Sequence, residues 1–216
     1  MAIVFDADFG SATQWVAGRT SAYPNMGPTN RADHKLDNLN HAYCPDGTFT
    51  ATRGWFSRQW SCNLLTTEGS PQAFQLKAGD TLHAQVTLPT GIGAWPAIWT
   101  WRDGGNEVDV FEYHPDHPDL LEVSNHLSGD SFYWHGASAG VAPGATVDLS
   151  TTIGADSVDW YAGDTLFHSD GQGVGADWSA YLIVNLSVSD GTYHPAPSFF
   201  GPRRLSWRCL SLRVER

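Results

Sequence analysis

The chain is dominated by short runs of alternating or continuous apolar residues, and Gly, Pro, Asp or Ser bounds each run. Runs of this length and spacing predict β-strands, whereas the 3.6-residue period of an amphipathic helix is scarce. The 22 Gly and 12 Pro suit the tight turns of an all-β domain. We therefore expect an all-β sandwich or jelly roll. The predicted strands are 48–52, 72–77, 81–88, 95–101, 107–113, 121–127, 131–136, 146–154, 157–162, 165–169, 180–188 and 205–214.

The length and the absence of repeats, low-complexity tracts and linkers predict one domain over residues 1–216. The turn Ala162-Gly163-Asp164 is a strong signal for a β-hairpin. The first 45 residues are less regular, and "YPNMGPTN" (23–30) has the composition of a loop. Loops of this kind wrap a sandwich or line its cleft.

The net charge of -11 argues against a nucleic acid or an anionic membrane as partner. No apolar stretch approaches the length of a membrane span. Ten Trp residues suit either the binding of neutral sugars through ring faces or a large core, and composition does not separate these two interpretations.

Three cysteines, Cys44, Cys62 and Cys209, lack the C-x-x-C spacing of a zinc site. One disulfide with a free thiol and no disulfide at all are both compatible with them. The first residues, "MAIVFDADFG", lack the basic and apolar regions of a signal peptide. An intracellular protein and the mature domain of a secreted one both remain open, and we favour the secreted one.

Three carboxylates crowd the segment "NEVDVFEY" (106–113). Strand alternation points Glu107 and Asp109 to one face and Glu112 to the other. A β-bulge near Val110 would bring all three to one face. Two carboxyl groups about 5–5.5 Å apart are the catalytic pair of retaining glycosidases. An acidic strand face or a calcium site is the alternative interpretation.

The segment "GAWPAIWTW" (93–101) followed by "NEVDVFEY" resembles the catalytic core of glycoside hydrolase family 16, in its laminarinase-like branch. Weaker similarities extend over nearly the whole chain: "DADF" (6–9), "DGTFTATR" (46–53), "LHAQVTLP" (82–89), "SVDWYAGDTLFHSDG" (157–171) and "YLIVNLSV" (181–188).

This resemblance implies a β-jelly-roll sandwich of two antiparallel sheets with a concave substrate cleft. It also implies retaining endo-hydrolysis of a β-linked polysaccharide. Glu107 would be the nucleophile, Glu112 the general acid/base and Asp109 the assisting carboxylate. We expect β-1,3- or mixed β-1,3/1,4-glucan as the substrate and a monomer as the active form. A lectin-like binding module, a transglycosylase and a hydrolase of galactans are the alternatives.

Several further residues are candidates for sugar binding. Trp95, Trp99 and Trp101 share strand parity, so they can face one side together and stack on sugar rings, with core packing as the rival interpretation. By resemblance, His126 and Asn185 would lie in the cleft near the acids, although His126 could equally be an ordinary sheet histidine.

The chain departs from the family pattern in two places. Gln85 stands where the resemblance implies a substrate-binding Arg, which puts the outer subsites in doubt. The segment 209–214 (CLSLRV) lacks the Asp that serves a structural calcium in many members, so we expect no cofactor and no calcium. The loop "HPDHPD" (114–119) contains possible metal ligands, but we expect it to shape a cleft wall and expect no metal site.

Overall fold

The computed structural model describes residues 1–23, 34–104, 106–127, 132–135 and 140–216. Within these ranges the chain forms β-strands and no helix, and therefore no helix long and apolar enough to cross a membrane. The strands are β1 (Ile3–Asp6), β2 (Val16–Ala17), β3 (Asp37–Asn40), β4 (Thr48–Thr52), β5 (Trp60–Thr66), β6 (Gln75–Lys77), β7 (Thr81–Thr87), β8 (Ala94–Trp101), β9 (Val108–Glu112), β10 (Leu121–Asn125), β11 (Phe132–His135), β12 (Thr146–Ile153), β13 (Val158–Ala162), β14 (Thr165–Ser169), β15 (Ser179–Val188) and β16 (Arg204–Glu215).

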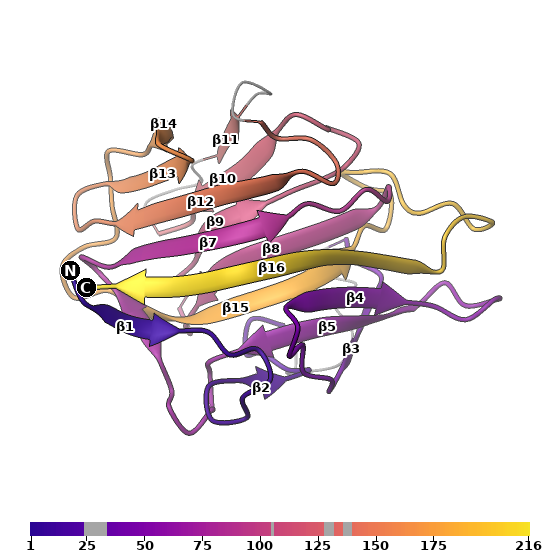
Figure 1. The fold of residues 1–216 in the computed structure, drawn as a ribbon, viewed down its shortest axis with the longest axis horizontal. Coiled ribbons are helices and arrows are strands. Elements are labelled where there is room, and N and C mark those ends of the chain that lie inside the picture. Colours follow the sequence, from indigo (N-terminus) through magenta and orange to yellow (C-terminus); the bar gives the residue numbers. More distant parts are fainter. Residues whose placement is uncertain (24–33, 105, 128–131, 136–139) are drawn as a thin grey trace.

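The strands form two layers that pack face to face (Figure 1). The inner layer, which carries the cleft described below, runs β11-β10-β9-β8-β15-β5, and the outer layer runs β4-β16-β7-β12-β13-β14. Strand β5 pairs with β15 in one layer and with β4 in the other, so the two layers are one continuous curled sheet. The all-β jelly-roll prediction is confirmed, with hydrogen bonds joining the two predicted sheets. The pair β3–β5 is parallel, and the other pairs are antiparallel.

All twelve predicted strands are present, and four strands were missed: β1, β2, β3 and β5. Strand β5, "WSCNLLT", is buried on both faces, so it has neither the alternating pattern nor the turn residues that identify an amphipathic strand. The predicted hairpin is confirmed, because Gly163 and Asp164 connect β13 to β14 and Gly163 adopts a φ of 57°. The left-handed conformation explains the glycine at this turn.

Indole groups of the outer layer donate hydrogen bonds to the backbone of the inner layer, on the side away from the cleft. The Trp160 indole N–H donates to the backbone oxygen of Asp109 at 2.9 Å, and that of Trp207 donates to the backbone oxygen of Asn185 at 3.1 Å. The Trp207 ring also packs edge-on against Phe111, with 5.5 Å between ring centroids. These contacts bury large apolar surfaces while satisfying the polar indole nitrogens. They hold β9 and β15 in place from behind.

Cys44, Cys62 and Cys209 are all free and buried, which excludes the disulfide left open by the sequence. Burial raises the pKa of the Cys44 thiol to about 12, and it also raises the pKa of Cys62 and of Cys209. A thiol that stays protonated is a poor nucleophile, so the three cysteines act here as core residues.

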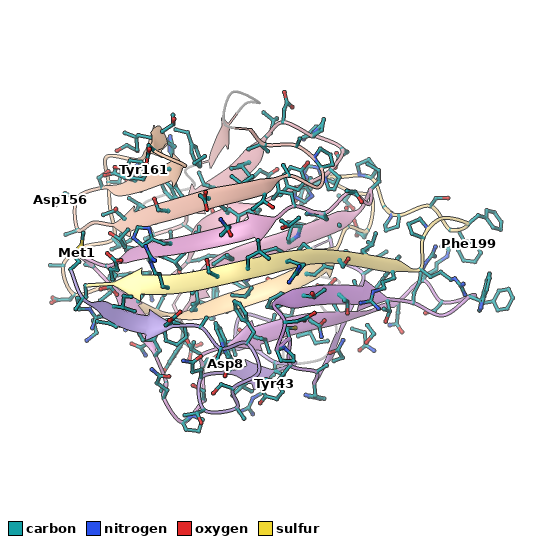
Figure 2. The ribbon with its side chains drawn as sticks, viewed as in Figure 1. Met1, Asp8, Tyr43, Asp156, Tyr161 and Phe199 are labelled. Carbon is teal, nitrogen blue, oxygen red and sulfur yellow. The ribbon has the colours of Figure 1, made fainter. Side chains whose placement is uncertain are left out.

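The connection between β15 and β16 (189–203) projects beyond the strands, with Phe199 at its outer end (Figure 2). The Arg53 guanidinium ties it to the β4–β5 connection by donating to the backbone oxygens of Ser198 (2.7 Å) and Phe199 (2.8 Å). The same connection carries Tyr193 and His194 to the end of the cleft described next. The anchor therefore helps to place two cleft residues.

Candidate active site

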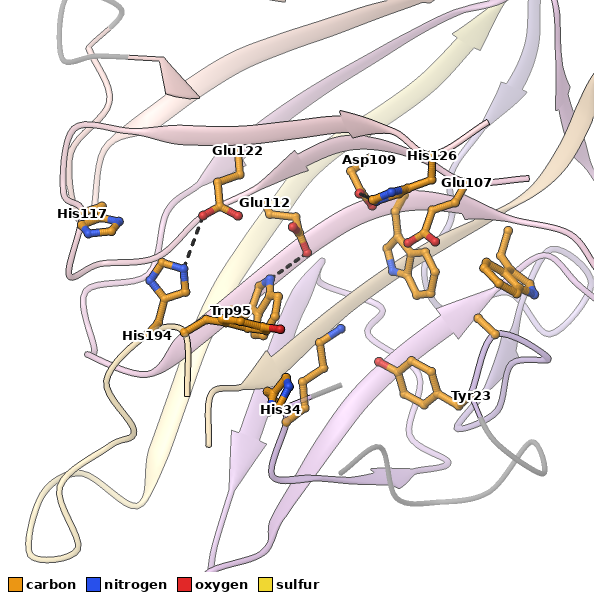
Figure 3. Close-up of a pocket in the computed structure, with 15 residues that line it drawn as sticks. Tyr23, His34, Trp95, Glu107, Asp109, Glu112, His117, Glu122, His126 and His194 are labelled. Carbon is orange, nitrogen blue, oxygen red and sulfur yellow. Dashed lines mark hydrogen bonds and ion pairs between the residues drawn. The ribbon is translucent and has the colours of Figure 1, made fainter. Parts of the chain in front are cut away.

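A cleft of about 980 Å³ lies on the concave face of the inner layer (Figure 3). Its size suits a ligand as large as a short oligosaccharide. Strands β8 and β9 supply its floor, and the segments around Tyr23, Lys35 and His194 supply its walls. Its aromatic members are Tyr23, Trp95, Trp99, Trp101 and Tyr193, and its acidic members are Glu107, Asp109, Glu112 and Glu122.

The β-bulge predicted in β9 is confirmed. Asp109 faces Ser124 of β10 and Glu112 faces Glu122, so three steps along β9 match two steps along β10. The same shift occurs against β8, where Trp99 faces Asp109 and Ala97 faces Glu112. The extra residue restores the parity that strict alternation would break. Glu107, Asp109 and Glu112 consequently all line the cleft.

Asp109 lies at the centre of a hydrogen-bonded group. The Ser124 hydroxyl donates to one carboxylate oxygen of Asp109 and also lies 2.9 Å from the His126 ring nitrogen Nε2. His126 Nε2 lies 3.4 Å from that same carboxylate. One ligand atom each of Glu107, Asp109 and His126 lies within 4.8 Å of the others, so Asp109 and His126 flank the Glu107 carboxylate. This arrangement can orient Glu107 and modulate its charge.

Glu112 sits in a different environment, against aromatic and charged groups. The Trp95 indole N–H donates to its Oε1 at 2.7 Å. Burial raises the pKa of Glu112 well above its usual value, and the negative charges of Asp109 and Glu122 act in the same direction. The Lys35 ammonium and the Trp95 hydrogen bond oppose this rise without cancelling it. Glu112 therefore holds its proton to higher pH than an exposed glutamate does.

The three tryptophans of β8 all line the cleft, as their shared parity predicted. Trp99 is nevertheless only 6% exposed, whereas Trp95 and Trp101 are half-buried. The Trp99 and Trp101 rings lie edge to face with 6.5 Å between centroids, and Lys35 Nζ lies 4.5 Å from the Trp95 ring centroid. Trp95 and Trp101 thus offer the more accessible ring surfaces at the two ends of β8.

Asn185 lies under the floor of the cleft, with 2% of its surface exposed. Its side-chain oxygen accepts the Trp99 indole N–H at 2.8 Å, and its amide donates to the Ser187 hydroxyl at 2.8 Å. In this structure Asn185 supports Trp99, and it does not line the cleft surface. Sugar contact by Asn185 stays a prediction, whereas its support of Trp99 is a direct observation.

Several cleft residues lie far along the chain from the three acids and were not predicted. Tyr23, Lys35, Glu122 and His194 carry no motif, and only the fold brings them to the three acids. The expected loop at 23–30 gave an indirect signal, since Tyr23 lines the cleft; residues 24–33 lie outside the described residues.

The interpretation of Gln85 as a substrate-binding position is wrong. Strand β7 belongs to the outer layer, where Leu82, Ala84 and Val86 face the core and Gln85 faces outward. The Gln85 amide donates to the Asp148 carboxylate on the neighbouring strand β12 at 2.8 Å. Gln85 is on the opposite side of the sheet from the cleft, so it carries no information about the subsites.

The calcium position of the resemblance maps to a small pocket lined by Asp8, Asp46 and Leu210. The Leu210 side chain offers no oxygen ligand. The Asp8 carboxylate accepts the backbone N–H of Gly10, and that of Asp46 accepts both the backbone N–H and the hydroxyl of Thr48. Calcium takes six to eight oxygen ligands, and the side chains of this pocket supply only the two carboxylates of Asp8 and Asp46, so the expected absence of calcium stays a prediction.

The raised pKa of Glu112 has a consequence for stability. The folded protein holds this proton more tightly than the unfolded chain, so ionisation of Glu112 lowers the free energy of unfolding as pH rises between the unfolded-state pKa and the raised folded-state pKa. Glu112→Gln removes that loss and keeps an acceptor for Trp95. We expect its Tm at pH 7 to exceed that of the wild type by about 2–4 °C, with the difference vanishing near pH 4.

Thermal unfolding at several pH values measures this difference. Asp148→Asn is the control, because Asp148 is an exposed carboxylate on the outer layer. A Glu112→Gln variant that is less stable than the wild type at pH 7 would contradict the expected cost of ionising Glu112.

No family model and no curated protein matches the sequence. Solved structures match the fold. The endo-β-1,3-glucanase of Pyrococcus furiosus superposes with a TM-score of 0.79 at 19% identity, covering 98% of this chain and 93% of that chain. The laminarinase catalytic domain of Thermotoga petrophila RKU-1 gives 0.77 at 20% identity, covering 99% and 96%. A structure described with endo-acting O-glycanases of the human gut microbiota, which initiate mucin breakdown, gives 0.71 at 12% identity, covering 99% and 98%.

These matches span the whole chain, and they establish that it has the curled jelly-roll fold of the glucanases to which its motifs are similar. The matched proteins act on different glycans, so the fold by itself does not select a substrate.

Proposed function

We propose that the protein is a retaining, endo-acting glycoside hydrolase that cleaves a β-linked polysaccharide, with β-1,3- or mixed β-1,3/1,4-glucan as substrate. The observation that carries the proposal is the bulge in β9, which gathers Glu107, Asp109 and Glu112 on the cleft surface. A bulge that had only a structural role would not need to bring like charges together in a partly buried cleft.

In the first step of the proposed reaction, the ionised Glu107 carboxylate attacks the anomeric carbon and forms a glycosyl ester. The C–O bond to the leaving sugar breaks, and Glu112 gives its proton to that oxygen. The raised pKa of Glu112 supports this role, because a general acid must hold its proton at the working pH. Asp109 and His126 lie beside Glu107 and can orient it.

In the second step, Glu112 is ionised and takes a proton from water, whose oxygen attacks the anomeric carbon. The ester to Glu107 breaks and the carboxylate is released, with retained configuration. The half-buried faces of Trp95 and Trp101 support binding of sugar rings on either side of the acids. An acceptor sugar in place of water would make the same protein a transglycosylase.

The test is reducing-end release from laminarin, lichenan, barley β-glucan, agarose and xyloglucan, with Glu107→Gln as the inactive control. Release from laminarin or from the mixed-linkage glucans, abolished in the variant, would support the proposal. Release from agarose alone would favour the galactan alternative. Binding without release, unchanged by Glu107→Gln, would overturn catalysis and favour a lectin-like module.

The proposed division of roles predicts a bell-shaped pH dependence of kcat/KM. The acidic limb reports the need for an ionised nucleophile, and the alkaline limb reports loss of the Glu112 proton. Because the pKa of Glu112 is raised, we expect the alkaline limb at higher pH than an ordinary glutamate would give. The two limbs belong to the coupled acids as a pair. An activity that rises through this alkaline range would contradict the assignment of Glu112 as the acid.

We propose in addition that the protein acts as a monomer outside the cell. One chain supplies all the described residues of the cleft, and a long polysaccharide does not cross a membrane to reach an intracellular enzyme. Size-exclusion chromatography with light scattering tests the monomer.

A further inference from the structure

A second cluster of titratable side chains lies at the end of the cleft beside Trp95, and Figure 3 shows two of its members, Glu122 and His194. His114 and Asp116 come from the connection that follows β9, Glu122 from β10, and His194 from the connection between β15 and β16. His194 Nδ1 lies 3.0 Å from Asp116 Oδ2, and His194 Nε2 lies 3.4 Å from Glu122 Oε1. The glycosidase mechanism proposed above assigns no bond-making or proton-transfer step to these four side chains.

His114 is the member that ordinary packing does not explain. It is 2% exposed, and neither of its ring nitrogens makes a hydrogen bond within the described part of the chain; its Nε2 lies 3.8 Å from Glu122 Oε2, beyond hydrogen-bond reach. Asp116 Oδ1 is likewise buried without a hydrogen-bond partner among those residues. Buried polar atoms of this kind are rare because each one loses its bonds to water without replacement. A cation that accepts electron pairs from the imidazole and from the carboxylate oxygen would satisfy both.

The donor set identifies the chemical class of that ligand. One ligand atom each of His114, Asp116 and His194 lies within 4.8 Å of the others. Two imidazoles and a carboxylate are a typical ligand set for zinc, whereas calcium and magnesium prefer oxygen ligands alone. The negative charges of Asp116 and Glu122 would balance a divalent cation.

We propose that His114, Asp116 and His194 form a zinc-binding site, with Glu122 at its edge. This site is separate from the three carboxylates of the β9 bulge, and it revises the expectation of no metal site in the 114–119 loop. The sequence of the 114–119 loop does not predict the full ligand set, because His194 lies 78 residues beyond Asp116 in the chain.

The ring geometry shows what binding requires. The His114 and His194 rings are parallel, with 3.4 Å between centroids and 4° between planes. Parallel rings direct their lone pairs side by side, so one ring must turn about its Cβ–Cγ bond for both to reach one ion. That torsion is broad and permits the turn. The bound ion would then join two connections that flank the cleft, next to the indole that donates to Glu112.

A protonated His194 is the competing explanation, since one imidazolium could lie between Asp116 and Glu122 without a metal. It accounts for the two contacts of His194. It does not satisfy His114 or the second oxygen of Asp116, which the zinc site does.

The test is binding of Zn²⁺ to chelator-treated protein by calorimetry, together with thermal unfolding and the visible absorption of bound Co²⁺. We expect one equivalent of Zn²⁺ to bind and to raise Tm by about 5–10 °C at a hundredfold excess over Kd. His194→Gln and Asp116→Asn should each lower the affinity at least tenfold and shift the Co²⁺ spectrum. Both retain side-chain volume, which guards against the misfolding that a change at the fully buried His114 could cause.

The matched control is His83→Gln. His83 lies on the outer layer, 3.9 Å from Glu215, so it tests adventitious binding of zinc to a histidine beside a carboxylate. Its loss should leave the stoichiometric binding unchanged. The zinc site is overturned if the wild type binds no equivalent of Zn²⁺ or Co²⁺, or if His194→Gln and Asp116→Asn bind as tightly as the wild type. Neither outcome depends on sugar release, so the glycosidase proposal is tested independently.

Discussion

Glu107→Ala is expected to lower kcat on the polysaccharide by about 10⁴-fold or more, because it removes the atom that forms the covalent bond to the sugar. The fold should tolerate the change, since Glu107 is only half-buried and precedes the first residue of β9. Its backbone oxygen still accepts the His126 amide at 3.0 Å whatever the side chain is. The loss should therefore appear in turnover and leave Tm nearly unchanged.

Rescue of Glu107→Ala by azide would show that the lost activity is that of a nucleophile. The cavity left by Glu107→Ala admits a small anion, which can attack the anomeric carbon directly while Glu112 still protonates the leaving group. The product is a glycosyl azide of inverted configuration, which NMR identifies. Asp148→Ala on the outer layer is the control, with full activity and no response to azide. A Glu107→Ala variant that keeps more than a tenth of the activity would refute the role of Glu107.

Glu112→Gln is expected to lower turnover of the polysaccharide by about 10²–10⁴-fold, the usual contribution of general acid catalysis. Glutamine can accept the Trp95 hydrogen bond but has no proton to donate to a sugar leaving group. The alkaline limb of the pH profile should disappear with it. The same change is expected to raise Tm at pH 7. A variant with lower turnover and higher Tm has lost a catalytic group and is not misfolded.

Leaving-group dependence provides the measurement. A dinitrophenyl glycoside expels an anion that needs no proton, so formation of the glycosyl ester should be nearly as fast in Glu112→Gln as in the wild type. Pre-steady-state release of the phenolate isolates this first step. An equal loss on the activated glycoside and on the polysaccharide would assign Glu112 to something other than acid catalysis.

Some features of the site could be predicted from the sequence, and others could not. The spacing of Glu107, Asp109 and Glu112 predicted a bulge, because without one the triad could not share a face, and the register of β9 confirms it. The prediction for Gln85 failed because a local motif does not indicate in which layer its strand lies. Strand β5 was missed because burial on both faces removes the alternation on which strand prediction depends.

By itself the sequence determined the β class and twelve of the strands, since each depends on periodicity within one segment, and it showed that the three carboxylates needed a bulge to share a face. Only the tertiary structure decided what surrounds them. Lys35 and Trp95 reach Glu112 from other segments, and burial raises its pKa. His194 meets Asp116 across 78 residues of chain. Contacts between distant segments depend on how the sheet curls, and no local pattern in the chain encodes that curl.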